Sequence, residues 1–330
     1  MDRIAVIGAG SWGTAVAALA ARKHPVRLWA RRPELAALIN SQSENPEYLP
    51  GHRLPYGLSA TSDLEEAVSG ADVVMMAVPS HGFGQVLSQL PLPDEVPLIS
   101  LTKGIEVDTL RRMTEVIAAV RPNHRPEVVG VLSGPNLAAE VMAGNPTASV
   151  IAMTEADTAD RVQSVLMGPT FRVYTNDDVI GCELAGSLKN VMAIAAGMSN
   201  GLGFGDNTRA TLITRALAEL TRLGVALGGA PATFSGLAGM GDLIATCTSP
   251  MSRNYRVGFA LAQGRSLADI TGEMNMVAEG VKTTRAVLQL AARADVEMPI
   301  ADQVGRVLYE GHHPREAVLT LMSRGARSER

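Results

Sequence analysis

The sequence predicts an α/β protein in which a doubly wound parallel sheet is followed by an all-helical half. Three observations support this fold class. Short apolar runs alternate with helical patterns in the first half of the chain. A glycine-rich turn joins the first run to the first helical pattern. After Thr175 the strand signal disappears, and long helical patterns follow. We therefore expect two domains, covering residues 1–176 and 177–330.

The expected strands are continuously apolar runs, without the alternation typical of a half-exposed sheet. They cover residues 3–10, 26–30, 71–79, 96–104, 127–135, 147–153 and 171–175. Helical patterns separate the first of them at 11–23, 33–41 and 81–90. Parallel strands covered on both faces have this composition. Their carboxyl ends meet at one edge, where ligands of such sheets bind.

The second half reads as helices with one long glycine-rich loop. The helical patterns cover residues 178–199, 208–227, 254–263, 279–293, 300–310 and 314–323. The loop is expected at 234–258. No Pro- or Ser-rich linker separates the two halves, so we expect them to join through a packed helix.

Composition excludes several classes of function. The 330 residues carry a net charge of −4 with no basic run, which argues against nucleic-acid binding and against an anionic membrane surface. No uninterrupted apolar run reaches the ~18 residues of a membrane span, so no membrane insertion is expected. The first 21 residues are interrupted by glycines, which disfavours a signal peptide. Two cysteines, Cys182 and Cys247, fit buried free thiols in a reducing cytoplasm.

No metal-ligating pattern is present in the sequence. His312 and His313 are adjacent and precede Pro314, so they cannot share a helix face and indicate a turn.

The glycine turn predicts a dinucleotide site and hence a Rossmann-type sheet. Gly8, Gly10 and Gly13 have G-x-G-x-x-G spacing between a strand and a helix. The first glycine permits a tight turn, the second allows close approach of a pyrophosphate, and the third allows the helix to pack on the strand. Ser11 and Trp12 lie in the first helical turn, where backbone N–H groups can meet phosphate.

Arg31 and Arg32 follow the second strand, where an NAD site usually has an acidic residue. A guanidinium can clamp a 2′-phosphate, so NADP(H) is favoured as the cofactor and NAD(H) is possible. Alternatively, the two arginines are a solvated surface pair.

Polar residues follow two further strands at the predicted ligand edge. Lys103 ends one of them, and Ser133, Gly134 and Asn136 end another. Pro135 opens a short helix there, whose N-terminus is a potential anion site. An ordinary surface loop is the alternative for Lys103.

The helical half contains a candidate phosphate clamp. Ser252, Arg253 and Asn254 offer a hydroxyl, a charged fork and an amide at a helix start, and Asp242 precedes them. Alternatively, Ser252 only caps the helix and Arg253 is solvated. Near the next helix start, Val277 and Glu279 are candidates, although Glu279 also fits a simple capping acid.

Lys189 is a charged residue in an apolar, small-residue helical run at 182–197. Its helix face also carries Ala185, Gly186, Met192, Ala193 and Ala196. A poorly hydrated amine suits general acid/base work, and Asp242 could orient it. Asn190 and Glu183 lie elsewhere on the helix and could hydrogen-bond the domain junction. The alternative is a lysine that snorkels to water.

A resemblance to a known family rests on motifs spread along nearly the whole chain. In order, they are GAGSWGTA, LTKGIE, LSGPNLAAE, ELAGSLKNVMAIAAG, GLAGMGDLIATCTSPMSRNYRVG, VAEGVKT and PREAVLTLMSR. With them the sequence resembles the bacterial NAD(P)-dependent glycerol-3-phosphate dehydrogenases. The resemblance implies interconversion of sn-glycerol 3-phosphate and dihydroxyacetone phosphate by hydride transfer, supplying glycerol 3-phosphate for phospholipid synthesis. It also implies a homodimer.

The resemblance assigns expected roles to individual residues. Lys189 is expected to be the proton acceptor. The implied substrate contacts are Lys103, Gly134, Lys189, Asp242, Ser252, Arg253 and Asn254. The implied cofactor contacts are Gly8, Gly10, Ser11, Trp12, Gly13, Arg31, Arg32, Lys103, Ala138, Arg253, Val277 and Glu279. Asn136 stands where the bacterial pattern has Ser or Thr, and we expect it to keep a polar contact with substrate. A related β-hydroxyacid or ketopantoate-type dehydrogenase and a non-catalytic dinucleotide-sensing protein are the competing hypotheses.

Overall fold

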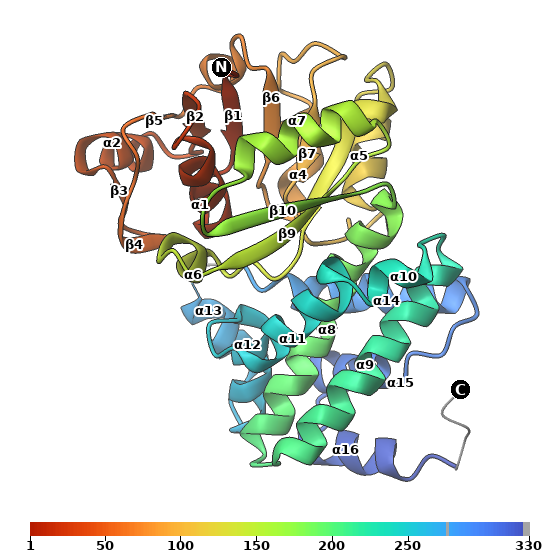
Figure 1. The fold of residues 1–330 in the computed structure, drawn as a ribbon. Coiled ribbons are helices and arrows are strands. Elements are labelled where there is room, and N and C mark those ends of the chain that lie inside the picture. The colour runs from red at the N-terminus through yellow and green to blue at the C-terminus, as the bar shows by residue number, and fades with distance from the viewer. Residues whose placement is uncertain (275–276, 326–330) are drawn as a thin grey trace.

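A computed structural model describes residues 1–274 and 277–325 and contains one large sheet above a cluster of helices (Figure 1). The eight-stranded sheet has the order β10-β9-β8-β7-β6-β1-β2-β5. Its strands are β1 (Ile4–Ile7), β2 (Val26–Trp29), β5 (Leu58–Thr61), β6 (Val73–Met76), β7 (Leu98–Ser100), β8 (Val129–Ser133), β9 (Thr147–Ala152) and β10 (Phe171–Asn176). A separate hairpin pairs β3 (Glu44–Asn45) with β4 (Leu49–Arg53).

The direction of the last two strands differs from the expectation of an all-parallel sheet. β9 pairs antiparallel with β8, and β10 is parallel to β9. The remaining neighbours in the sheet pair in parallel. The expectation failed because β9 and β10 are also apolar, and apolar composition does not fix strand direction. Only β1, β2, β5, β6, β7 and β8 therefore have their carboxyl ends at the shared edge.

Helices cover both faces of the sheet, as in a doubly wound fold. One core contains Val6 of β1, Val16 of α1 and Val162 of α7, and the other contains Phe83 of α4 and Val116 of α5. The helices of this half are α1 (Ser11–Ala20), α2 (Pro33–Gln42), α3 (Leu64–Val68), α4 (Ser80–Leu87), α5 (Met113–Val120), η1 (Pro126–Val128), α6 (Ala138–Met142) and α7 (Ala156–Leu166).

The second half is helical throughout its described residues and is built around α8. Its helices are α8 (Val179–Gly201), α9 (Asp206–Ala226), α10 (Pro231–Phe234), η2 (Leu237–Gly241), α11 (Asp242–Thr248), α12 (Arg253–Ala262), α13 (Leu267–Glu273), α14 (Glu279–Arg293), α15 (Pro299–Tyr309) and α16 (Pro314–Met322). In length and composition α8 could span a membrane, but 89% of its most apolar window is buried inside the protein. It is the core helix of this half.

Glycines let α12 pack closely on α8. A Cβ at Gly197 would lie 2.0 Å from the carbonyl oxygen of Tyr255, and a Cβ at Gly258 would lie 1.9 Å from that of Ile194. Both distances are far below van der Waals contact, so these two positions admit no side chain without a backbone shift.

The stretch 234–258, expected as a loop, is largely helical. It contains the π-helix η2 and the helix α11, and Asp242 is the first residue of α11. Glycine suggested a loop, yet a Cβ at Gly239 would lie 2.1 Å from the carbonyl oxygen of Phe234. The glycine is needed for tight helical packing, and π-turns of this kind are frequent at functional sites.

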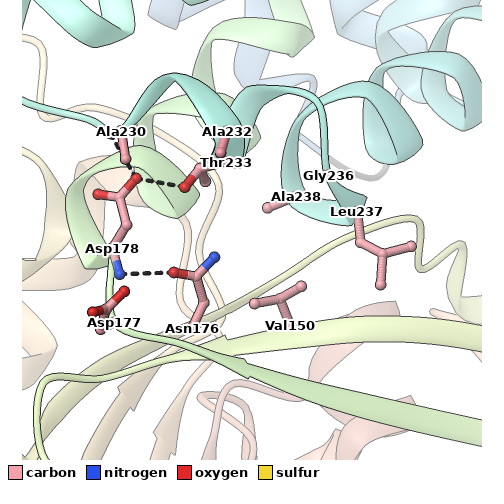
Figure 2. A pocket seen from close by; sticks show the side chains of 10 residues that line it. All are labelled: Val150, Asn176, Asp177, Asp178, Ala230, Ala232, Thr233, Gly236, Leu237 and Ala238. Carbon is pink, nitrogen blue, oxygen red and sulfur yellow. Dashed lines mark hydrogen bonds between the residues drawn. The ribbon is translucent and has the colours of Figure 1, made fainter.

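Asp178 fixes the start of α8 just after the last strand. Its carboxylate accepts hydrogen bonds from the backbone N–H of Gly181 (2.8 Å) and of Ala230 (2.8 Å) and from the Thr233 hydroxyl (2.6 Å). These contacts border a hollow of about 250 Å³ between the end of β10 and η2 (Figure 2). None of the residues proposed for catalysis or binding lines this hollow.

Candidate functional site

The glycine turn between β1 and α1 has the geometry of a phosphate cradle. Gly8 has φ +119°, and a Cβ there would lie 2.7 Å from the carbonyl oxygen of Ala77. A Cβ at Gly13 would lie 1.9 Å from the carbonyl oxygen of Gly8, so α1 packs directly on the turn. Above Gly10, no atom of a non-neighbouring described residue lies within 4 Å of the Cβ position, and no side chain from this described part of the chain caps α1. The residues present therefore fit a dinucleotide pyrophosphate held by backbone N–H groups.

Ser11 and Trp12 begin α1 beside this cradle. The Ser11 hydroxyl donates a hydrogen bond to the carbonyl oxygen of Tyr48 (2.6 Å). The Trp12 ring packs against Phe171 at 6.5 Å between centroids. Its buried Nε1 has no hydrogen-bond partner in the part of the chain that the structure describes.

Arg31 and Arg32 follow β2 at the same edge, and both are exposed. Arg32 forms an ion pair with Glu47, and this hydrogen bond raises the pKa of its guanidinium. Arg31 has no ion-pair partner among the described residues. Both side chains are solvent-exposed, as expected of a surface pair, and Arg32 also has an acidic partner that the sequence did not suggest.

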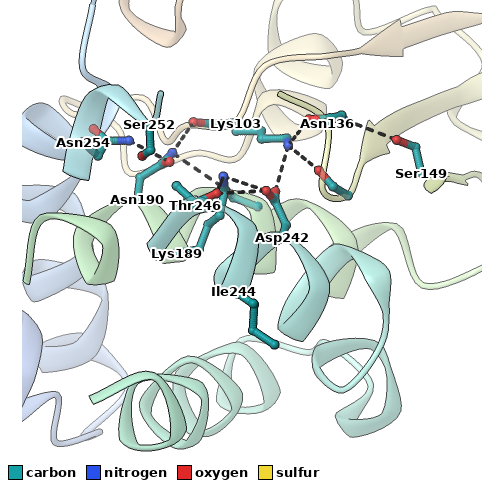
Figure 3. A network of polar contacts seen from close by, with 12 residues as sticks. Lys103, Asn136, Ser149, Lys189, Asn190, Asp242, Ile244, Thr246, Ser252 and Asn254 are labelled. Carbon is teal, nitrogen blue, oxygen red and sulfur yellow. Dashed lines mark hydrogen bonds and ion pairs between the residues drawn. The ribbon is translucent and has the colours of Figure 1, made fainter. Parts of the chain in front are cut away.

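Two lysines from different domains share the carboxylate of Asp242 (Figure 3). Lys103 Nζ lies 2.8 Å from Oδ2 of Asp242, and Lys189 Nζ lies 2.8 Å from Oδ1. Lys103 follows β7 of the sheet, whereas Lys189 and Asp242 belong to α8 and α11. We call these three residues the lysine–aspartate centre. The centre lies where the two domains meet.

Lys103 uses all three of its N–H donors within the protein. Besides Asp242, its Nζ donates to the carbonyl oxygen of Gly134 (2.9 Å) and to Oδ1 of Asn136 (2.6 Å). Asn136 itself is buried and lies 3.5 Å from the hydroxyl of Ser149. Burial lowers the pKa of Lys103 to about 8; the nearby charge of Lys189 lowers it too, and Asp242 opposes the shift.

Lys189 is buried, with 5% of its surface exposed, so it does not snorkel to water. Its Nζ contacts Asp242 and donates to the hydroxyl of Thr246, which also lies 3.1 Å from Oδ1 of Asp242. An ammonium has three donors. Among the described residues two are used, which leaves one N–H for a substrate oxygen.

Asn190 connects the lysine–aspartate centre to the start of α12. Its Nδ2 donates to the carbonyl oxygen of Lys103 (3.1 Å), and its Oδ1 accepts from Nδ2 of Asn254 (2.9 Å). Asn254 Oδ1 in turn accepts from the N–H of Gly280 (3.0 Å). Asn190 is thus at the domain junction. Thr246 was not recognised from the sequence, although it lies one helical turn after Asp242.

The other residues of the candidate clamp begin α12 and α14. Ser252 caps α12 by accepting the N–H of Tyr255 (3.3 Å). Arg253 is half-buried and donates to the carbonyl oxygen of Val277 (2.9 Å), so it is not simply solvated. Burial lowers the pKa of its guanidinium.

Glu279 does more than begin its own helix. Its carboxylate accepts hydrogen bonds from the N–H (3.1 Å) and the hydroxyl (2.7 Å) of Ser80, at the N-terminus of α4. This contact joins the helical half to the sheet half. Ala138 is the first residue of α6, at the ligand edge beyond β8.

A further contact between the domains lies next to the loop that carries Lys103. Glu183 of α8 is buried and accepts hydrogen bonds from Arg112 (2.9 Å), and from the N–H (2.9 Å) and hydroxyl (2.7 Å) of Thr114. Ser187, one turn further along α8, donates to the carbonyl oxygen of Gly104 (3.2 Å). The loop that carries Lys103 is therefore fixed to α8 at several points.

The remaining sequence candidates lie away from this centre or are inert. No group of three or more His, Cys, Asp or Glu side chains that could hold a metal occurs in residues 1–274 and 277–325. His313 caps α16. Both cysteines are buried, and burial raises each thiol pKa to about 12.

A dinucleotide-binding glycine turn on a Rossmann-type sheet, together with a buried lysine–aspartate centre where a helical domain meets that sheet, indicates the class of nicotinamide-dependent dehydrogenases. Comparison with known proteins narrows the class. The family profile for the N-terminus of NAD-dependent glycerol-3-phosphate dehydrogenase matches residues 3–159, and that for its C-terminus matches residues 178–319.

Curated relatives and solved structures agree with these profiles. The chain is 55% identical to an NAD(P)+ glycerol-3-phosphate dehydrogenase of Sphingopyxis alaskensis over 92% of this chain and 90% of that protein. It is 52% identical to one from Citrifermentans bemidjiense over 99% of both. A crystal structure of glycerol-3-phosphate dehydrogenase from Coxiella burnetii has a TM-score of 0.92 at 40% identity, covering 98% of this chain and 99% of that one. The chain belongs to the NAD-dependent glycerol-3-phosphate dehydrogenase family and is an NAD(P)-dependent oxidoreductase.

The ketopantoate-type enzymes of the competing hypothesis share only their fold with this chain. A 2-dehydropantoate 2-reductase structure from Geobacter metallireducens has a TM-score of 0.60 at 15% identity.

Proposed function

We propose that the protein interconverts sn-glycerol 3-phosphate and dihydroxyacetone phosphate, with Lys189 as the general acid/base. The observation that carries this proposal is the buried Lys189 ammonium, which has one donor left unused by the described residues and lies in a centre shared by both domains. The bound nicotinamide coenzyme supplies or accepts the hydride. Lys189 donates a proton to the substrate oxygen in the reducing direction and removes it in the oxidising direction.

The other residues of the centre hold Lys189 and the substrate in position. Asp242 and Thr246 fix the Lys189 amine, and Lys103 supplies a second positive charge beside the same carboxylate. Two ammonium groups and one carboxylate leave an excess of one positive charge, which favours a phosphorylated substrate. Gly134 and Asn136 orient Lys103 through its other hydrogen bonds.

Substrate phosphate would bind at the start of α12. Arg253 offers a poorly hydrated guanidinium, and Ser252 and Asn254 lie beside it at the helix N-terminus. A helix N-terminus and a guanidinium together favour a phosphate dianion. Arg253 also reaches Val277, so it lies between the expected substrate and coenzyme positions.

The coenzyme would be held by the turn at Gly8, Gly10 and Gly13, with its adenosine end toward Arg31 and Arg32. We favour NADP(H) because two guanidiniums follow β2, and NAD(H) remains compatible with this edge. The cofactor contacts proposed at Ser11, Trp12, Ala138, Val277 and Glu279 all begin helices or lie just before one.

Four further features are proposed for the whole protein. Residues 1–176 form the dinucleotide-binding domain and residues 177–330 the substrate domain. The enzyme works as a homodimer. It is cytoplasmic, which fits two buried reduced thiols. Its product glycerol 3-phosphate feeds phospholipid synthesis.

One spectroscopic experiment tests the proposed reaction. The purified protein is mixed with NADPH or NADH, and absorbance of the reduced nicotinamide is followed after addition of dihydroxyacetone phosphate. A loss of absorbance that requires the phosphorylated ketone supports the proposal. If the coenzyme binds but its absorbance does not change, the proposed reaction is refuted and the protein only binds the dinucleotide.

A further inference from the structure

The sheet edge beyond β2 carries an acidic residue that does not directly follow β2 in the sequence. In NAD sites, a carboxylate shortly after the second strand accepts hydrogen bonds from the adenosine ribose hydroxyls. Here the residues after β2 are Arg31 and Arg32. The structure brings Glu47 to this edge from the turn between β3 and β4, where it pairs with Arg32.

The turn that carries Glu47 is fixed to the dinucleotide cradle. The buried Asn45 donates to the carbonyl oxygen of Ala9 (2.9 Å) and to the hydroxyl of Thr14 (2.8 Å), and it accepts the N–H of Tyr48 (3.2 Å). The Ser11 hydroxyl donates to the carbonyl oxygen of Tyr48 (2.6 Å). Glu47 therefore stands between two residues that are anchored to the phosphate-binding turn.

We propose that Glu47 and Arg32 are alternative partners for the adenosine ribose and together allow both coenzymes to bind. With NAD(H), the Glu47 carboxylate accepts hydrogen bonds from the 2′- and 3′-hydroxyls. With NADP(H), Arg32 leaves Glu47 and binds the 2′-phosphate. This inference rests on the proposed function only in placing a nicotinamide dinucleotide at the glycine turn.

The strength of the pair fits an exchange of partners. The side chains of Arg32 and Glu47 are 47% and 40% exposed, and ion pairs this exposed contribute little to stability. Either partner can therefore be released at small cost. A phosphate dianion also binds a guanidinium bidentately and carries more negative charge than a carboxylate, so it can displace Glu47 from Arg32. When the phosphate is bound, the displaced Glu47 carboxylate repels it, so Glu47 also limits the preference for NADP(H).

Direct binding of four probes tests the pair without relying on turnover. Dissociation constants are measured for NADH, NADPH, 5′-ADP and adenosine 2′,5′-bisphosphate with the wild type and with Glu47→Gln and Arg32→Ala. Glu34→Gln is the matched control, because Glu34 is an exposed acid on α2 next to Arg32. Thermal unfolding of each variant verifies that the fold is kept.

The Glu47→Gln substitution should change the dissociation constants of NADH and of the 2′-phosphorylated probes in opposite directions. Glu47→Gln should weaken NADH about tenfold and tighten both 2′-phosphorylated probes about threefold, in line with the loss of charge-assisted hydrogen bonds and of one repulsion. Arg32→Ala should weaken the 2′-phosphorylated probes at least about tenfold without weakening NADH. Glu34→Gln should leave every constant within about twofold.

Two outcomes would overturn the inference. One is a Glu47→Gln variant that binds NADH as tightly as the wild type. The other is an equal change for phosphorylated and unphosphorylated probes, which would mean a general charge effect. These binding outcomes are independent of the reaction: an enzyme inert toward dihydroxyacetone phosphate would refute the proposed function and still reveal whether Glu47 and Arg32 divide the coenzymes.

Discussion

Lys103 and Lys189 contact opposite oxygens of a single carboxylate, with each Nζ 2.8 Å from Asp242. Burial alone would raise the pKa of Asp242, but the positive charges of Lys103 and Lys189 outweigh it and lower that pKa. The carboxylate therefore stays ionised at neutral pH and holds the two ammonium groups near each other. Because Lys103 comes from the sheet and Lys189 from α8, the centre is complete only when both domains are docked.

Replacement of Lys189 by alanine should abolish most turnover without unfolding the protein. Loss of a positioned acid/base lowers kcat by about 10²- to 10⁴-fold. Lys103 and Asp242 still form their ion pair in this variant, so NADPH binding, followed by nicotinamide fluorescence, should be unchanged. Lys282→Ala, which removes an exposed lysine on α14, is the control. A Lys189→Ala enzyme within tenfold of the wild-type kcat would contradict the role.

The pH dependence of kcat/KM should follow the ionisation of Lys103. Burial lowers its pKa to about 8, so the ammonium is charged below this pH and loses its proton above it. Because the anionic substrate needs the positive charge, kcat/KM for dihydroxyacetone phosphate should decline as pH rises through about 8. Lys103→Arg keeps its charge at all these pH values, so a decline at the same pH in that variant would rule out this assignment.

Arg253→Ala should discriminate phosphorylated from unphosphorylated substrates. Loss of a charge-assisted bond to phosphate lowers kcat/KM for dihydroxyacetone phosphate by about 10- to 100-fold. The much lower rate with dihydroxyacetone, which lacks the phosphate, should change little. Arg256→Ala is the matched control, because Arg256 is exposed on the same helix. Equal losses of kcat/KM for both ketones would mean that the substrate phosphate does not bind Arg253.

Glu219 should make the stability of the helical half depend on pH. Its carboxylate is buried and accepts the N–H of Ile300 at the start of α15 (2.9 and 3.1 Å). Burial raises its pKa to about 7, against opposing hydrogen bonds from Ile300 and Ala301. Between the unfolded value of 4.5 and about 7 the folded state therefore binds more protons, so the free energy of unfolding falls as pH rises through this window.

Urea unfolding at pH 5.5 and pH 8 measures this effect. Glu219→Gln cannot ionise, so it should lose this part of the pH dependence and be more stable than the wild type at pH 8 by about 1–3 kcal/mol. Asp302→Asn removes an exposed carboxylate from α15 and should keep the wild-type slope. Identical slopes for Glu219→Gln and the wild type would contradict the prediction.

Local patterns in the sequence were sufficient for the longest helices, α8, α9 and α14, and for the glycine turn, whereas α7 was missed. The helix expected at 279–293 has the observed bounds of α14, because apolar spacing and a first-turn acid mark both its face and its start. β5 and the β3–β4 hairpin were missed, since their mixed polar residues lack a continuous apolar run. The direction of β9 was missed for the opposite reason, because its apolar character fits either direction.

Contacts between distant residues could not be derived from local patterns. Lys103 and Asp242 are 139 positions apart, and only the docking of two domains brings them together. Glu47 lies 15 positions after Arg32, but the turn that returns it to Arg32 depends on the buried side chain of Asn45. The burial of Lys189 was predictable, because its neighbours on the helix face are three alanines, one glycine and one methionine, which pack inward together with the lysine.

The order of elements along the chain has a consequence for biosynthesis. α8 is apolar enough to cross a membrane, yet α9, α11, α12, α14 and α15, which cover it, are all translated later. From Gly201 to Tyr309, the ends of α8 and α15, the ribosome adds 309 − 201 = 108 residues. At about 5–20 residues per second this takes roughly 5–20 s. During this interval the apolar surface of α8 lacks the later helices that cover it in the folded protein, so the core of the helical half can be completed only after α15 has been translated.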